Sequence, residues 1–181
     1  NIEKKKQILF FGQITSHKGL DYLLPAMEDV HRQLADTTLV VAGRGKFHFD
    51  ITPYQEKKYI DIRNRFIPDE ELAELIQESQ IVVCPYIDAT QSGVIMSAFA
   101  FGVPVIATNV GGLPEMVEHF KTGVIIPARD SQAIADNIVL LLNNPKLQLQ
   151  ISSNIYQKYV QGEMSWSSIV NNLRTNIYSS T

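Results

Sequence analysis

The sequence places a polar, glycine-containing turn directly before an apolar helical run. The turn is Thr90-Gln91-Ser92, and Gly93-Val94 opens the run that follows it. The start of a helix presents unpaired backbone N–H groups and the positive end of the helix dipole, so such a turn is suited to binding a phosphate. A serine at this place can equally cap a helix that binds no ligand. The spacing alone leaves both interpretations open.

A lysine at the start of the first predicted helix points to the same chemistry. Lys18 directly precedes Gly19-Leu20, where the helical pattern begins. The helix dipole disfavours a cation at this end of a helix, so the lysine makes more sense if an anion is its partner. On this argument alone, however, a solvated surface lysine is the favoured interpretation, and the neighbouring His17 is expected to be an exposed loop residue.

Two further glycine-bearing loops carry weaker signals. Gly43-Arg44-Gly45-Lys46 leaves room for a ligand to approach the backbone, but it lacks the spacing of a P-loop and of a dinucleotide fingerprint. A tight turn explains it equally well. Gly111-Gly112-Leu113-Pro114-Glu115 is interpreted as a structural turn, because Pro and Glu suit the first turn of a helix.

Other kinds of chemistry lack their residue patterns. The sequence has no Asp-x-Asp pair and no His/Cys cluster with metal-ligand spacing, so no metal site is predicted. It has no Gly-x-Ser-x-Gly nucleophile elbow. The single cysteine, Cys84, lies within an apolar run, which indicates a buried thiol in a reducing compartment.

Short apolar runs of strand length alternate with amphipathic helical patterns along the chain. Strands are predicted at residues 7–11, 38–42, 59–67 (one or two short strands), 81–84, 103–107 and 123–126. Helical spacing of apolar residues occurs at 20–34, 69–76, 134–142, 151–159 and 166–177, and the turns at 90–93 and 111–115 each open a helix. Residues 46–58 are expected to form a loop with at most one helical turn.

Apolar strands that alternate with helices favour a parallel sheet covered on both faces. We therefore predict an α/β, doubly wound, Rossmann-like domain with about six parallel strands. In such sheets ligands bind at the carboxyl ends of the strands. Glycines follow these ends at positions 12, 43, 45, 93, 111 and 112, so their loops are expected to line one cleft.

Composition narrows the class of protein further. The 181 residues suit a single domain with a sizeable core. The formal net charge of −3 offers no basic footprint for nucleic acid. No apolar stretch approaches the ~20 residues that a membrane helix needs, and no signal peptide is visible. The chain lacks an initiator Met and enters its first strand almost at once, so we expect a domain excised from a longer polypeptide.

Five sequence blocks occur in an order that resembles the carboxyl-terminal half of group 1 glycosyltransferases. They are FFGQITSHKGLDYLL, LVVAGRG, IRNRFIPDEELAELIQESQIVVCPYIDATQSGV, FGVPVIATNVGGLPEMVE and KTGVIIPARD. The resemblance runs from about Ile8 to Asn143, and more loosely to SWSSIVNNLRTNIY. These proteins are retaining sugar transferases of the GT-B fold, in which a C-terminal domain binds the nucleotide-sugar donor and an N-terminal domain binds the acceptor. The resemblance implies that residues 1–181 are the donor-binding domain alone, with C-terminal helices from about 145 to 180.

The resemblance also implies roles for individual residues. Gly12 and the Lys18-Gly19 pair match a block whose Arg and Lys hold the donor diphosphate; Gln13 stands at the Arg position, which leaves Lys18 as the expected catalytic cation. The segment around Phe66 receives the base, and the Ser92 loop contacts the phosphates through its amides. The donor-binding set implied besides Lys18 is Gly12, Gln13, Gly19, Gly43, Arg44, Phe66, Ile67, Tyr86, Thr90, Gln91, Ser92, Gly93, Val94 and Ser97.

One departure from the family pattern concerns its Glu-x7-Glu motif, whose carboxylates contact the donor sugar and the ribose. Ala89 and Ser97 stand at those two positions. A branch of the family carries an ATQSGV version of this loop, so the loss does not by itself imply an inactive enzyme. Ser97, or an amide of the Thr90-Gln91-Ser92 turn, is the candidate substitute for ribose recognition.

The function expected from the resemblance is metal-independent transfer of a hexosyl unit to a glycan or lipid-linked acceptor, in cell-surface polysaccharide biosynthesis. The donor would be a UDP-sugar, with a GDP-sugar as the second choice, and no further cofactor is expected. Expected partners are the nucleotide sugar and the missing N-terminal acceptor domain, in a protein located in the cytoplasm or peripherally at the cytoplasmic face of the membrane. The isolated chain is expected to bind a donor without turnover.

Two other functions compete with this one. A nucleotide-sugar-binding or regulatory module without catalysis would also explain the missing carboxylates. A receiver-type signalling domain shares the doubly wound fold, but it needs an acidic cluster after the first strand and an Asp at the end of the third strand. This chain has Gly12-Gln13 at the first place and residues 63–68 at the second, and neither supplies the required acidic residues.

Overall fold

The computed structural model describes residues 6–162. These residues form a six-stranded sheet in the order β3-β2-β1-β4-β5-β6. The strands are β1 (Gln7–Phe11), β2 (Thr38–Gly43), β3 (Ile60–Asn64), β4 (Ile81–Cys84), β5 (Val105–Thr108) and β6 (Gly123–Ile126). All neighbouring pairs are parallel, which confirms the predicted doubly wound, Rossmann-like α/β fold.

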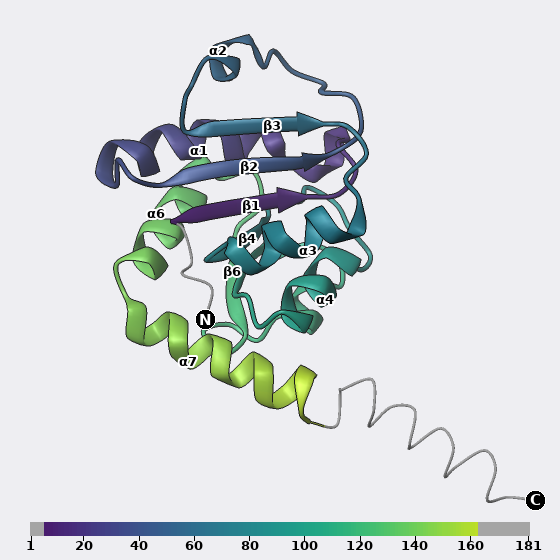
Figure 1. Cartoon of the computed structure of the whole chain (residues 1–181), viewed down its shortest axis with the longest axis vertical. Helices are drawn as coiled ribbons and strands as arrows, with labels where there is room; N and C mark the ends of the chain where they lie inside the picture. The colour runs from purple at the N-terminus through teal and green to yellow at the C-terminus, as the bar shows by residue number, and fades with distance from the viewer. Residues whose placement is uncertain (1–5, 163–181) are drawn as a thin grey trace, which may run out of the picture.

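Helices connect the strands and cover both faces of the sheet (Figure 1). They are α1 (Leu20–Gln33), α2 (Thr52–Gln55), α3 (Asp69–Glu78), α4 (Gly93–Ala100), α5 (Leu113–Met116), α6 (Ser131–Leu142) and α7 (Pro145–Ile155), with a 3₁₀ turn η1 (Ser16–Lys18) and a π-type turn η2 (Tyr156–Val160). α1 packs against α6 on one face, and α3 and α4 lie on the other.

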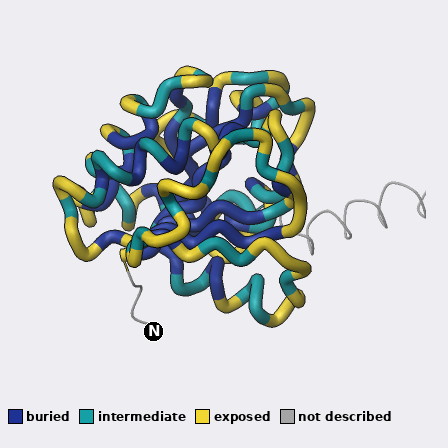
Figure 2. The backbone as a smooth tube through the Cα atoms, turned by 90° about the horizontal axis from the view of Figure 1, so that it is seen from above, coloured by how far each residue is buried: buried dark blue, intermediate teal, exposed yellow. Residues whose placement is uncertain are grey.

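Burial explains why the central strands read as continuous apolar runs. Every residue of β1, β4 and β5 is buried, whereas the edge strand β3 is buried only at Ile60. Figure 2 shows this as a buried interior enclosed by exposed loops and outer helix faces. A strand that is covered on both sides has no polar face, so its sequence cannot alternate.

The structure differs from the sequence prediction mainly at element ends. Residues 59–67 form one strand followed by a loop, and the predicted strand at 103–107 starts two residues later, after Pro104. α7 begins at Pro145 rather than 151, because the Asn144 side chain accepts from the Leu147 amide and caps it. The helix predicted at 166–177 lies outside the described residues.

The topology places a crevice between β1 and β4. The chain leaves β1 toward β2 on one side and reaches β4 from β3 on the other, so the connections diverge at this point. Ligands of doubly wound folds bind at such a switch point, outside the carboxyl ends of the strands. The loops after β1 and β4 carry Lys18 and Ser92 respectively.

Candidate functional site

The loops after β1 and β4 are fixed side by side by backbone contacts. The Ile87 amide donates to the His17 carbonyl at 2.8 Å. Gly19 has a φ of +69°, and a Cβ at this position would lie 1.8 Å from the Pro85 carbonyl oxygen. Only glycine allows this approach, so Gly19 holds the start of α1 against the end of β4.

Lys18 emerges from this junction and has an aromatic ring as its neighbour. Its Nζ lies 3.6 Å from the centroid of the Tyr86 ring. No salt bridge to Lys18 occurs within residues 6–162. Partial burial lowers the pKa of Lys18, because desolvation penalises the ammonium form. The site therefore holds a half-buried cation that an arriving anion would stabilise.

The start of α4 lies beside this loop and offers free backbone donors. A helix leaves the amides of its first turn without intrahelical partners, and in α4 these belong to Gly93, Val94 and Ile95. Ser92 occupies the N-cap position, yet its side chain makes no capping hydrogen bond. Of the two interpretations left open by the sequence, the serine side-chain cap does not form: Ser92 is buried, and its hydroxyl faces the Tyr86 hydroxyl at 3.4 Å.

Gly12 joins this region to a neighbouring cavity. A Cβ built on Gly12 would lie 3.4 Å from Cγ2 of Val94, so the loop after β1 reaches the first turn of α4. On its other side, the Gly12 carbonyl oxygen would lie 1.8 Å from a Cβ on Gly43. The loops after β1 and β2 are thus in backbone contact, and glycine at position 43 permits it.

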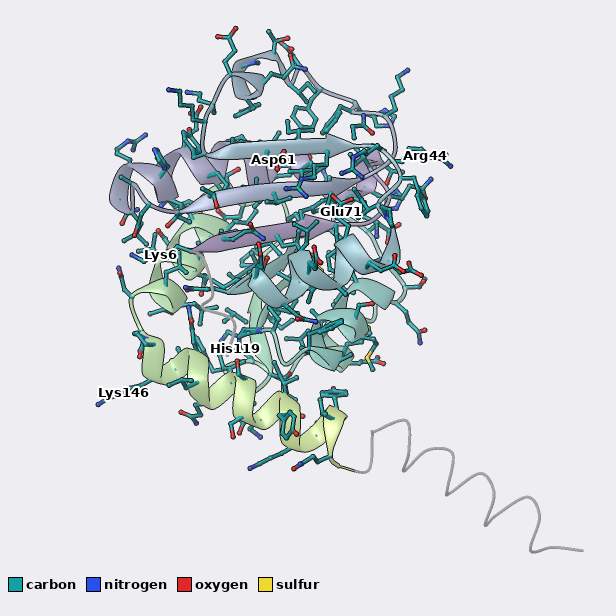
Figure 3. All side chains as sticks on the ribbon, in the orientation of Figure 1. Lys6, Arg44, Asp61, Glu71, His119 and Lys146 are labelled. Atoms are coloured by element: carbon teal, nitrogen blue, oxygen red, sulfur yellow. The ribbon has the colours of Figure 1, made fainter. Side chains whose placement is uncertain are left out.

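The cavity at the ends of β1, β2 and β3 has a volume of about 300 Å³. Its lining residues are Phe11, Gly12, Gln13, Ala42, Gly43, Arg44, Arg65, Phe66, Ile67 and Leu72. Six of them belong to the donor-binding set implied by the sequence. The Phe66 side chain is 72% exposed, so its ring presents a flat apolar surface at the rim. Arg44 lies at the carboxyl ends of the strands in Figure 3.

Sequence reasoning missed a network of charged residues at the rim of this cavity. Arg65 donates to both carboxylate oxygens of Glu71, at 2.8 and 2.6 Å, and to the Phe66 carbonyl at 3.1 Å. Arg63 donates to Glu71 at 2.9 Å and to Asp61 at 2.8 Å. Hydrogen bonds from Arg65 and then Arg63 lower the pKa of Glu71. This network fixes the connection from β3 to α3, and Figure 3 shows Asp61 and Glu71 on these two elements.

The turn at Ala89 and Thr90 packs on a second glycine pair, Gly111 and Gly112. The Gly112 amide donates to the Thr90 carbonyl at 3.1 Å. Gly111 has a φ of +50°, and a Cβ there would lie 1.5 Å from the Ala89 carbonyl oxygen. The segment 111–115 therefore supports the turn from behind, while Thr90 and Gln91 are exposed on its outer side.

Two residues of the predicted donor-binding set, Tyr86 and Ser97, have side chains that are buried or already hydrogen-bonded. Tyr86 is fully buried, so it presents no side-chain surface to a bound molecule. The Ser97 hydroxyl donates to the Gly93 carbonyl at 2.9 Å, which leaves only its lone pairs for another partner. In contrast, Gly12 reaches Val94, and Lys18 and Gly93 belong to the two loops that are joined at the switch point.

Residues 6–162 contain neither a metal-binding cluster nor a membrane-spanning helix. No group of three or more His, Cys, Asp and Glu side chains in this range is arranged to hold a metal ion. No helix in the same range is long and apolar enough to cross a membrane.

Comparison with known proteins identifies a family. The sequence model described as glycosyl transferases group 1 matches residues 1–158. An uncharacterized glycosyltransferase of Haemophilus influenzae is 29% identical over 153 residues, which cover 82% of this chain and 43% of that protein. The chain spans less than half the length of the curated relatives it matches.

Solved structures have the same fold. The C-terminal domain of a group 1 family glycosyl transferase (LpcC) from Francisella tularensis has a TM-score of 0.74 at 25% identity, over 86% of this chain and 84% of that one. HepE from Anabaena, solved in complex with UDP, has a TM-score of 0.78 at 20% identity, over 98% of this chain and 50% of that one. With the family match across residues 1–158, these findings establish that the chain belongs to the group 1 glycosyltransferases.

Proposed function

We propose that this chain is the donor-binding domain of a longer glycosyltransferase that transfers a hexosyl unit from a nucleotide diphosphate sugar to a glycan or lipid-linked acceptor. The observation that carries the proposal is the half-buried Lys18 cation, which has no salt-bridge partner within residues 6–162 and lies over Tyr86, whose hydroxyl contacts Ser92 at the uncapped start of α4. As the glycosidic bond breaks, negative charge builds up on the departing diphosphate. Fixed dipoles and a cation stabilise that charge without reorganising during the reaction.

The adjoining cavity supports a nucleoside as the other end of the ligand. Gly12 lies between the cavity and Val94, so a diphosphate at α4 would continue into the cavity through its nucleoside. The base would lie near Phe66 and Ile67, with the ring of Phe66 available for stacking. Arg44 and Gln13 supply the polar contacts of the lining. The volume of about 300 Å³ lies at the lower end of the range for small-molecule sites.

A UDP-sugar is the favoured donor. HepE, whose chain contains this fold, was solved with UDP, and the present cavity lies at the strand ends of the same fold. A GDP-sugar is the second choice. No metal or further cofactor enters the proposed mechanism, because Lys18 and the α4 amides supply the stabilisation of the diphosphate.

The remaining parts of the proposal concern the longer protein. We propose that an N-terminal domain binds the acceptor, since the curated relatives are about twice as long as this chain. The chain alone would then bind a donor but transfer no sugar. The setting we propose is cell-surface polysaccharide biosynthesis in the cytoplasm or at the cytoplasmic face of the membrane.

A non-catalytic nucleotide-sugar-binding module is the second candidate. It is favoured by Ala89 and Ser97, because neither position supplies a carboxylate and the Ser97 hydroxyl is bonded to its own helix. The two candidates differ in the full-length protein: an enzyme releases UDP from UDP-glucose in the presence of acceptor, and a regulatory module binds the donor without consuming it.

The proposal is tested by a ligand panel. Thermal unfolding of the 181-residue chain is followed with UDP, GDP and ADP, with the matching nucleosides, and with UDP-glucose. We expect UDP to raise Tm most, since a ligand present at 100 times its Kd stabilises the folded state by about 2.7 kcal/mol. Uridine should give a smaller shift. Absence of a shift with every nucleotide would contradict the proposal.

A further inference from the structure

Tyr86 lies at the centre of the proposed diphosphate site without being exposed. It follows β4 by two residues, and its side chain has no exposed surface. The Thr108 hydroxyl at the end of β5 donates to the Tyr86 carbonyl at 2.6 Å. Its backbone is therefore anchored to two central strands, and a buried tyrosine needs partners for its ring and its hydroxyl.

The ring of Tyr86 holds the Lys18 ammonium without neutralising it. The distance of 3.6 Å from Nζ to the ring centroid is well within the range of cation–π contacts. A ring attracts the ammonium through its quadrupole but carries no formal charge. The cation is therefore held in place while its net charge remains available to a phosphate, whereas a carboxylate in the same position would already be paired with it.

The hydroxyl of Tyr86 faces the other half of the site. It lies 3.4 Å from the Ser92 hydroxyl, directly before the first residue of α4. The third polar group here, the Cys84 thiol, is fully buried, and burial raises its pKa to about 12. The thiol is therefore neutral at physiological pH and supplies no counter-charge to Lys18.

We infer that Tyr86 is a positioning residue that joins the two halves of the anion site: its ring holds the Lys18 ammonium, and its hydroxyl contacts Ser92 at the start of α4. This inference rests on the proposed donor-binding function. It explains why a fully buried aromatic residue lies where the family resemblance implied a direct contact to the donor. Tyr86 would act on the diphosphate only through Lys18 and α4.

The test is a double-mutant cycle measured by calorimetric titration of the 181-residue chain with UDP and with uridine. The variants are Y86L, which removes ring and hydroxyl, Y86F, which keeps the ring, K18M, and the doubles Y86L/K18M and Y86F/K18M. We expect Y86L to weaken UDP binding about tenfold, within the range of coupled neighbouring residues. Uridine affinity should stay within about twofold, because the nucleoside cavity does not include Tyr86.

The coupling between the two residues is the decisive result. K18M should reduce UDP affinity much less in the Y86L background than in the parent. In the Y86F background, K18M should reduce UDP affinity by the same factor as in the parent. Independent losses for Y86L and K18M would overturn the inference, and so would equal losses of UDP and uridine, which indicate a structural role. If Y86L does not melt cooperatively, Y86M replaces it.

A ligand-free measurement separates this inference from the proposed function. In spectra of the chain with ¹³C-labelled lysine, the Lys18 ε-methylene signal should carry a ring-current shift that Y86F keeps and Y86L or Y86M loses. A parent that shows this shift but binds no UDP contradicts the proposed function. A parent that binds UDP but lacks the shift overturns the role of Tyr86.

Discussion

Two neighbouring parts of the surface at the strand ends differ in whether their cations are paired with carboxylates. At the rim of the cavity, Arg65 is paired with both oxygens of Glu71, and Arg63 bridges Glu71 and Asp61. At the switch point, the Lys18 ammonium lies over the face of the Tyr86 ring and has no salt bridge among residues 6–162. The rim cations are already satisfied and fix the shape of a loop, whereas the switch-point cation is held ready for an anion. Charge that lacks a protein partner is thus the better guide to the ligand.

The largest expected effect comes from Lys18→Met, which keeps most of the length of the side chain and removes the charge. We expect UDP affinity to fall by about 1.5–3 kcal/mol, the range for a hydrogen bond to a charged group, with little change for uridine. Without ligand the variant should unfold no more readily than the parent, because it removes a partly desolvated charge. Calorimetric titration and thermal melting measure the two quantities.

Arg65→Met is the matched control from the rim. It also removes one cation, but that cation is bonded to Glu71 and lines the nucleoside cavity. We expect UDP and uridine to lose affinity equally, and Tm without ligand to fall. If Arg65→Met selectively weakened UDP and Lys18→Met did not, the contrast between the two regions would be reversed.

The next prediction uses pH. Burial lowers the pKa of Lys18 below its usual 10.5, and a bound diphosphate raises it again by stabilising the ammonium. UDP affinity should therefore be fully developed below the pKa of the free chain and should decrease as pH rises through it, before 10.5 is reached. Lys18→Met should lack this decrease. An identical alkaline profile in parent and variant would show that another group titrates.

Glu71→Gln should have the smallest effect. The Glu71 carboxylate is bound by two exposed or half-exposed arginines, and such surface pairs contribute little in water. We expect a fall in Tm of at most a few degrees at neutral pH. Because arginine contacts lower the pKa of Glu71, the difference from the parent should persist above 4.5 and disappear as pH falls from 4.5 through the lowered pKa of the folded chain. Added salt should shrink it too.

The fold was predictable because burial leaves a simple mark on the sequence. The central strands are buried on both faces and therefore read as unbroken apolar runs, and glycines mark the loops that follow them. The ends of elements were less predictable. Asn144 caps α7 well before its apolar pattern begins at Ile151, and local capping bonds carry no periodicity.

The site was predictable where backbone geometry demands a residue type, and unpredictable where side chains meet through space. Gly19 and Gly43 are required by close backbone contacts, and Gly12 by its φ of +116°. The contact of Lys18 with Tyr86 joins residues 68 positions apart, and no local pattern reports it. The same holds for Ser92, whose neighbours in sequence suggested a cap while its burial directs the hydroxyl to Tyr86.

The backbone junction between the loops after β1 and β4 has a consequence for engineering. The loops are joined through the Ile87 amide, the His17 carbonyl and the close approach of Gly19 to Pro85. The side chains that line the cavity are therefore not needed to hold the two loops together. A library randomised at Gln13, Arg44 and Phe66 should change which nucleoside is preferred while preserving the grip on its diphosphate. The loop junction would thus stay constant while the residues that contact the nucleoside are exchanged.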